Sequence, residues 1–109
     1  MKRKKHTSKY EHYMADSFAR SASKAKSTGD LSRAVTLYEH ALNFETEAIN
    51  LYCLEHGTMP YLVEHYRNAV TYALECGRVN KARHLLETAL GSELPADRAA
   101  EFAKMLAEM

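Results

Sequence analysis

The sequence predicts an all-α protein of about five helices, and three observations support this fold class. Apolar residues recur at steps of three and four along most of the chain, which is the spacing of one helix face. Four glycines divide the chain into segments of helical length: Gly29, Gly57, Gly77 and Gly91. No segment shows the strict alternation of apolar and polar residues that is typical of a half-buried strand. We therefore expect helices joined by short turns, without a β-sheet.

The longest predicted helix lies between Gly29 and Gly57, and the rest of the chain is organised around it. It contains no glycine or proline between Asp30 and His56, and these residues are the main breakers of a helix interior. Asp30 is the expected N-cap. One face carries Leu31, Ala34, Val35, Tyr38, Ala41, Leu42, Ala48, Ile49 and Tyr52, and a second line carries Leu37, Phe44 and Leu51. A helix that is apolar on two sides needs two neighbours, so we place it between the preceding and the following helix.

Four shorter helices complete the predicted fold. We expect them at residues 8–28, from 58–60 to 76, at 79–90, and from 92–95 to the C-terminus. The first has an apolar face of Tyr10, Met14, Phe18, Ala22 and Ala25, and its many alanines and serines permit close helix approach. Only a very short turn follows it, so the first two helices should be antiparallel neighbours.

The chain is expected to be one domain, residues 8–109, preceded by a disordered basic tail, residues 1–7. The tail holds Lys2, Arg3, Lys4 and Lys5, which repel one another and bury nothing. The formal net charge is +1 and these four residues contribute +4, so the remainder carries −3, unlike a typical nucleic-acid binder. No apolar run approaches the roughly 20 residues of a membrane span, and no secretory signal follows the basic residues. We expect a cytoplasmic protein, or a nuclear one if the source is eukaryotic.

One helical hairpin occurs twice in the chain. When Gly29 is aligned with Gly77, the apolar positions match: Leu31 with Val79, Ala34 with Ala82, Tyr38 with Leu86 and Ala41 with Ala89. The stretch GDLSRAVTLYEHA resembles the tetratricopeptide repeat (TPR) pattern G-x-[YL]-x-x-A-x-x-x-[FY]-x-x-A, and GRVNKARHLLETA is a poorer copy. The resemblance implies two antiparallel TPR-like hairpins with a capping helix at the C-terminus.

Two departures from the TPR pattern bear on this interpretation. The two glycines are 48 residues apart where the family's period is 34, and the proline that closes the motif is missing after Ala41. We assign most of the 14 additional residues, about four helical turns, to the longest helix, so that the first hairpin projects beyond the second. The same stretch is also similar to the second helix of the microtubule-interacting and trafficking (MIT) three-helix domain. An unrelated helical bundle is a further alternative.

The TPR resemblance also implies a groove lined by the first helix of each hairpin. Its contact positions would be Asp16, Ala19, Ser23 and Lys26 in the first helix, and Glu64, Arg67, Asn68 and Thr71 in the third. The family's clamp for a C-terminal carboxylate needs Lys and Asn where this chain has Ala19 and Ser23, so we do not expect that ligand. Arg67 and Asn68 could still bond a peptide carboxylate or backbone.

A second candidate interface is the apolar group at the end of the longest helix. It comprises Phe44, Leu51, Tyr52 and Tyr61. If these side chains are exposed, self-association as a homodimer is the simplest outcome. The alternative is that neighbouring helices bury them.

The pattern of potential catalytic and metal-binding residues favours a protein without a cofactor. Each of four histidines directly follows a glutamate, and adjacent helical residues point about 100° apart, so these pairs form no joint site. The chain has no His-Glu-x-x-His, no closely spaced Cys/His set, no nucleophile motif and no phosphate-binding glycine loop. We expect the histidines on helix surfaces, Cys53 and Cys76 as buried thiols, no metal and no enzymatic activity. Convergence of His12, His40, His56 and His65 on a metal remains an alternative.

These observations favour a non-catalytic protein–protein interaction module, a small TPR-like adaptor or complex subunit that binds a peptide or helix of a partner. One alternative is a small nucleic-acid-associated regulator that uses the basic tail. It predicts salt-sensitive binding that is lost when residues 1–5 are deleted. A third hypothesis, a metal-binding or catalytic bundle, predicts metal retained through purification.

Overall fold

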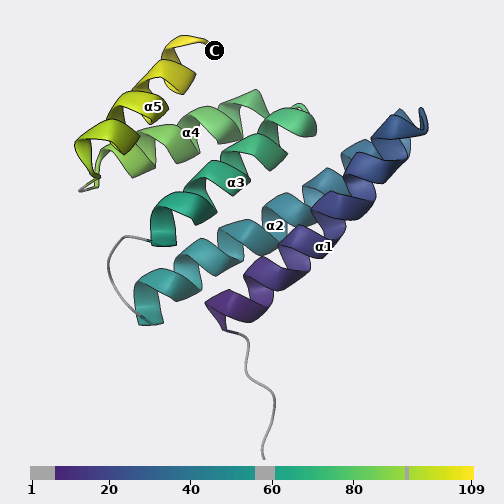
Figure 1. The fold of residues 1–109 in the computed structure, drawn as a ribbon, viewed down its shortest axis with the longest axis horizontal. Coiled ribbons are helices and arrows are strands. Elements are labelled where there is room, and N and C mark those ends of the chain that lie inside the picture. The colour runs from purple at the N-terminus through teal and green to yellow at the C-terminus, as the bar shows by residue number, and fades with distance from the viewer. Residues whose placement is uncertain (1–6, 56–60, 93) are drawn as a thin grey trace, which may run out of the picture.

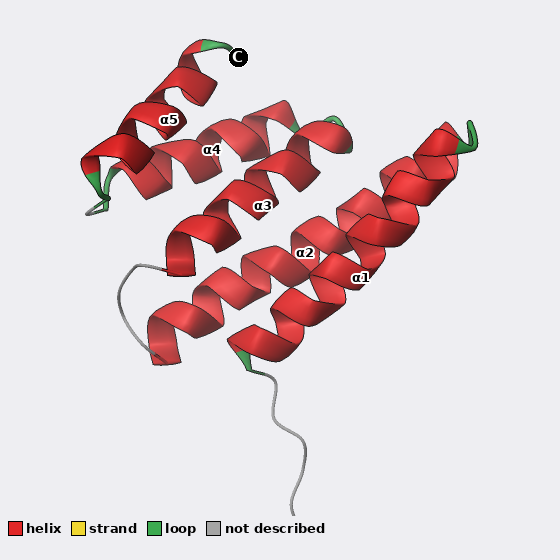
Figure 2. Ribbon diagram, viewed as in Figure 1, coloured by secondary structure: helices red, strands yellow, loops and turns green. Residues whose placement is uncertain are grey.

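The computed structural model describes residues 7–55, 61–92 and 94–109. Its helices are α1 (Ser8–Ser27), α2 (Leu31–Glu55), α3 (Tyr61–Glu75), α4 (Val79–Leu90) and α5 (Ala96–Ala107). Figures 1 and 2 show them in chain order, and no strand occurs within the described residues. The predicted all-α fold class is confirmed, and the helix ends lie close to the predicted positions. The four basic residues of the tail and the predicted start of the third helix at 58–60 lie outside the described residues.

The two hairpin turns have the same backbone geometry. Gly29 and Gly77 have φ values of 87° and 80°, in the left-handed region where a side chain is strained. The N–H of Asp30 donates to the carbonyl of Ala25 at 2.9 Å. In the second hairpin, the N–H of Arg78 donates to the carbonyl of Ala73 at 2.8 Å. Both are the long-range bond of a Schellman motif, which ends a helix at a glycine. The repeat in the sequence is therefore also a repeat in the backbone.

Side chains cap the starts of α1 and α2. Asp30 accepts a hydrogen bond from the N–H of Arg33 at 3.2 Å, as predicted for an N-cap. Thr7 accepts one from the N–H of Tyr10 at 3.1 Å. Thr7 is thus the N-cap of α1.

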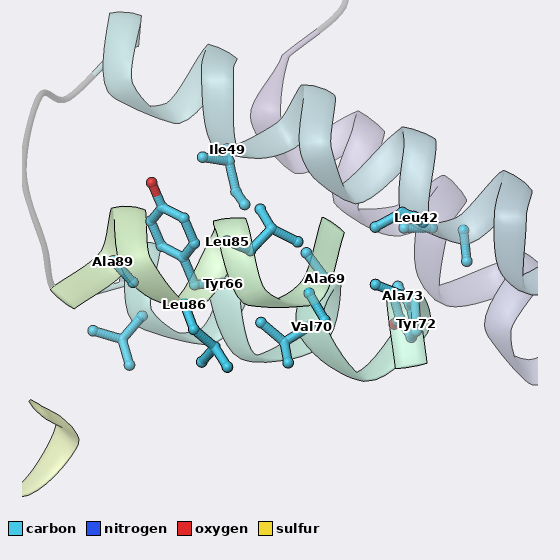
Figure 3. Packing of buried hydrophobic residues seen from close by; sticks show 14 of the residues in the cluster. Leu42, Ile49, Tyr66, Ala69, Val70, Tyr72, Ala73, Leu85, Leu86 and Ala89 are labelled. Atoms are coloured by element: carbon cyan, nitrogen blue, oxygen red, sulfur yellow. The ribbon is translucent and has the colours of Figure 1, made fainter. Parts of the chain in front are cut away.

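The helix α2 lies between α1 and α3, and each helix packs against the next one in the chain. Its buried apolar side chains are Ala34, Tyr38, Ala41, Leu42, Ala48, Ile49 and Tyr52. Figure 3 shows Ile49 directed toward Leu85 of α4 and Tyr66 of α3. The central position predicted for the longest helix is confirmed.

The two hairpins have unequal lengths. The helix α2 has 25 residues and α4 has 12, so the additional residues of the first repeat lie mainly in α2, as expected. Figure 1 shows the turn between α1 and α2 lying beyond the turn between α3 and α4. Leu31 and Val35, predicted on the buried face, are exposed because they lie at this projecting end.

The helix α5 packs on α4 and occupies the end of the array, where a capping helix was predicted. Phe102 is its fully buried anchor. Arg67 of α3 also binds the carboxylate of Glu101 of α5 through two nitrogens, at 3.1 and 2.9 Å. An apolar anchor and a charged pair thus hold the last helix to the rest of the domain.

The buried face of α1 differs from the prediction. Tyr10, Met14 and Phe18 are only partly buried, whereas the small or polar residues Ser8, Glu11 and Ala15 are buried beside Ala22 and Ala25. Small side chains allow α1 and α2 to approach closely, so the large ones lie at the edge of the interface. Cys53 is exposed and Cys76 half-buried, so the expected burial of Cys53 was wrong. Among the described residues, no helix has the length and apolar character needed to cross a membrane.

Candidate functional site

A cleft of about 720 Å³ opens where the first half of α1, the second half of α2 and the first half of α3 meet. Its lining is contributed by all three helices: Ser8, Lys9, His12, Tyr52, Glu64, His65 and Asn68. The start of α1 is held there by Glu55 of α2, whose carboxylate accepts from the N–H of Ser8 at 3.0 Å and from its hydroxyl at 2.6 Å. The cleft walls are therefore fixed by hydrogen bonds as well as by packing.

A buried carboxylate with two histidines lies at the base of this cleft. Glu45 is fully buried. The Nδ1 atom of His12 lies 2.9 and 3.0 Å from the two oxygens of Glu45, and Nδ1 of His65 lies 2.7 Å from Oε2. We call these three residues the His–Glu–His cluster. Three different helices contribute them, so the cluster exists only in the folded domain.

Helix geometry explains why these three side chains meet. Glu45 lies three or four residues from Ala41, Leu42, Ala48 and Ile49, so it shares the buried face of α2. A buried carboxylate is costly unless hydrogen bonds and opposite charge compensate for lost water. The two imidazole N–H groups provide that compensation. No buried side-chain nitrogen or oxygen in the described part of the chain lacks a hydrogen-bond partner.

The ring arrangement positions both histidines. The rings of His12 and His65 meet edge to face, with their centroids 4.8 Å apart. The ring of Tyr52 meets the ring of His65 edge to face, with the two ring centroids 5.5 Å apart. The hydrogen bond to Glu45 raises the pKa of His12 above 6.5, and burial opposes this rise. A positive charge on His12 is thus stabilised beside the carboxylate.

The cluster corrects one expectation from the sequence. His65 is 7% exposed and His12 half-buried, so these two histidines are not solvated surface residues. The expectation that adjacent Glu-His pairs form no joint site concerned residues within one helix, whereas this cluster joins residues of different helices. A signal was present in the sequence, because Glu45 interrupts an otherwise apolar face of α2. A charged residue at such a position requires a partner.

The predicted groove residues separate into two groups. Glu64 and Asn68 line the cleft. Asp16 pairs with Arg20, Lys26 pairs with Glu75 at 2.9 Å, and Ala19, Ser23 and Thr71 lie outside the cleft. Of these predicted groove residues, only Glu64 and Asn68, in the first half of α3, therefore line the cleft.

Arg67 belongs to a charged network that joins α3 to α5. Besides Glu101, it bonds Glu64 at 2.8 Å, and Arg98 lies 3.7 Å from Glu64 and 3.3 Å from Glu101. The hydrogen bond to Arg67 lowers the pKa of Glu101 below its usual 4.5, and burial opposes this change. Arg67 thus has partners within the chain that the sequence did not indicate.

The second predicted interface is largely covered. Tyr52 is buried, Leu51 is half-buried, and Phe44 stacks on Phe18 with centroids 5.4 Å apart. The side chain of Tyr61 lies outside the described residues. Among the described residues, neighbouring helices therefore cover most of this apolar group, as the alternative interpretation predicted, and the group does not form an exposed patch.

Comparison of the chain with protein-family models, with curated proteins and with solved structures gave no match.

Proposed function

We propose that this chain is a TPR-like protein interaction module that binds an extended, acidic segment of a partner protein in the cleft between α1 and α3. The observation that carries the proposal is the position of the cleft. The first helix of each hairpin, α1 and α3, lines the cleft, and α2 contributes Tyr52 between them. This is where the TPR resemblance implies a ligand groove, and it contains two of the implied contact residues, Glu64 and Asn68.

The repeated turn supports the TPR-like interpretation over the MIT alternative. Both hairpins turn at a glycine with positive φ and the same Schellman bond. A three-helix domain also leaves no place for α4 and α5, which continue the array beyond α3. The protein is therefore best regarded as two hairpins and a cap.

The chemistry of the cleft indicates an acidic segment. Lys9 is exposed and forms no ion pair with any described residue, so its ammonium can receive a carboxylate. Asn68 offers an amide that both donates to and accepts from a peptide backbone. The carboxylate of Glu64 already interacts with Arg67 and Arg98, so it opposes an acidic ligand less than an isolated charge would.

A displayed library of random peptides tests this proposal. The full chain should enrich sequences with Asp or Glu at a fixed position, and Lys9→Glu should lose that enrichment because it reverses the charge that receives the carboxylate. The matched control is Lys104→Glu, which makes the same change at an exposed position of α5. Absence of enrichment by the wild type, or the same acidic motif from Lys9→Glu, would refute the proposal.

A further inference from the structure

We propose that His12, Glu45 and His65 bind one divalent transition-metal ion, such as Zn²⁺, at the base of the cleft. This inference is independent of the peptide partner proposed above. It starts from the donor atoms. Two imidazole nitrogens and one carboxylate, contributed by three helices, lie within 4.8 Å of one another.

The type of donor selects the class of ion. Imidazole suits Zn²⁺ and its neighbours in the first transition row, whereas Mg²⁺ and Ca²⁺ prefer sites made of oxygen ligands. Two histidines with one carboxylate are also a ligand set found in zinc proteins that keep one coordination position open. The cluster therefore favours a transition metal over an alkaline-earth ion.

The donor atoms lie near enough to one another to converge on one ion. Ligands of a tetrahedral ion with bonds of about 2.0–2.1 Å lie about 3.3 Å apart. Each Nδ1 atom lies 2.7–3.0 Å from an oxygen of Glu45, and the three ligand atoms all lie within 4.8 Å of one another, so small rotations of the side chains would bring them to these separations. The ion would take the place of the two N–H protons that point at Glu45. A neutral imidazole would carry its proton on Nε2 instead, and a protonated imidazole would release one proton to solvent.

The cleft provides both an entry path and a fourth ligand. His12 and His65 line the cleft, whereas Glu45 lies behind them and is fully buried. An ion held by the three residues would therefore face the cleft on its open side, where water or an anionic group of a ligand can bind. Tyr52 packs against His65 and limits the movement of that ring.

Metal titration of the full-length chain tests the proposal. After dialysis against a chelator, the wild type should bind one equivalent of Zn²⁺ by calorimetry, and Zn²⁺ should raise its melting temperature. His12→Gln removes the most accessible ligand and should weaken binding at least about tenfold. His84→Gln changes an exposed histidine of α4 and should leave binding unchanged.

Two further measurements keep the test decisive. Co²⁺ added to the wild type should give the visible absorption of a four-coordinate ion, and His12→Gln should not. Circular dichroism should show that His12→Gln is folded, because this position is half-buried and not in the core. Absence of Zn²⁺ binding by the wild type, or equal affinity of wild type and His12→Gln, would show that the cluster is a hydrogen-bonded structural group only.

Discussion

Gly29 and Gly77 have the left-handed backbone that ends α1 and α3, and nothing lies within 4 Å of a Cβ placed at either position. The cost of a side chain there is thus backbone strain alone. We predict that Gly29→Ala and Gly77→Ala each lower the free energy of unfolding by about 1–2 kcal/mol. Urea denaturation measures this change.

Gly91 provides the matched control for this prediction. It ends α4 with a φ of −79°, and an added Cβ would make only ordinary contacts of 3.5 Å. Gly91→Ala should therefore be neutral or slightly stabilising, because it restricts the unfolded chain without strain. An equal loss of stability in all three variants would contradict the role assigned to the positive φ.

Glu45 is the residue whose burial depends most on its partners. Glu45→Gln replaces the acceptor of two imidazole N–H groups by an amide that accepts through only one oxygen. We predict a loss of about 1–3 kcal/mol in the free energy of unfolding of the metal-free protein, because a buried hydrogen bond is lost. Glu47→Gln, an exposed position two residues away, should stay within about 0.5 kcal/mol of the wild type. Equal stability of both variants in chemical denaturation would exclude the energetic role given to Glu45.

At the scale of the helix, the sequence predicted the structure well because helix ends are determined locally. Asp30, Gly29 and Gly77 act through bonds within a few residues, so their roles can be read from the sequence alone. The His–Glu–His cluster could not be predicted in this way. Its members are separated by 33 and 20 residues, and their meeting depends on how three helices rotate against one another.

The docking of α5 depends on Phe102, which is fully buried against the rest of the core. Phe102→Ala should lower the free energy of unfolding by about 3–5 kcal/mol, since it removes a large buried side chain and leaves a cavity. Hydrogen exchange should show the largest loss of protection in α5. Ala103→Ser, at the exposed neighbouring position, should leave exchange in α5 nearly unchanged. Protection that is lost first in α1 would argue against Phe102 as the anchor of α5.

The charged pair between α3 and α5 predicts a pH dependence. Arg67 lowers the pKa of Glu101 in the folded protein below 4.5, so the pair stabilises the fold above that pH. The contribution is lost as the pH falls through the lowered folded pKa and Glu101 is protonated. The wild type should therefore have a higher melting temperature than Glu101→Gln at about pH 7, and the difference should shrink as the pH falls below 4.5. Glu108→Gln, at an exposed carboxylate of the C-terminal end, is the control and should match the wild type at about pH 7. A constant difference between wild type and Glu101→Gln would contradict the assignment.

At the scale of the whole molecule, the arrangement of two hairpins creates the cleft. The TPR resemblance implied a groove between the first helices of the hairpins, and the cleft lies between α1 and α3. Its position along these helices was not predictable from the sequence, because Arg67 and Lys26 have ion-pair partners on helices distant in the chain. The other lining residues were not among the predicted groove residues: Ser8, Lys9, His12, Tyr52 and His65. Of these, His12 and His65 belonged to the alternative of four histidines converging on a metal.

The measurement that tests the central claim most directly is a nuclear magnetic resonance titration of the ¹⁵N-labelled chain with an acidic peptide enriched from the displayed library. If the cleft is the binding site, the largest chemical-shift changes should occur at Lys9, His12, His65 and Asn68. The amides of α4 and α5 should change little. Changes concentrated instead around Leu74, Val79, Met105 and Met109, which line a separate pocket between α3, α4 and the C-terminal end, would contradict the account.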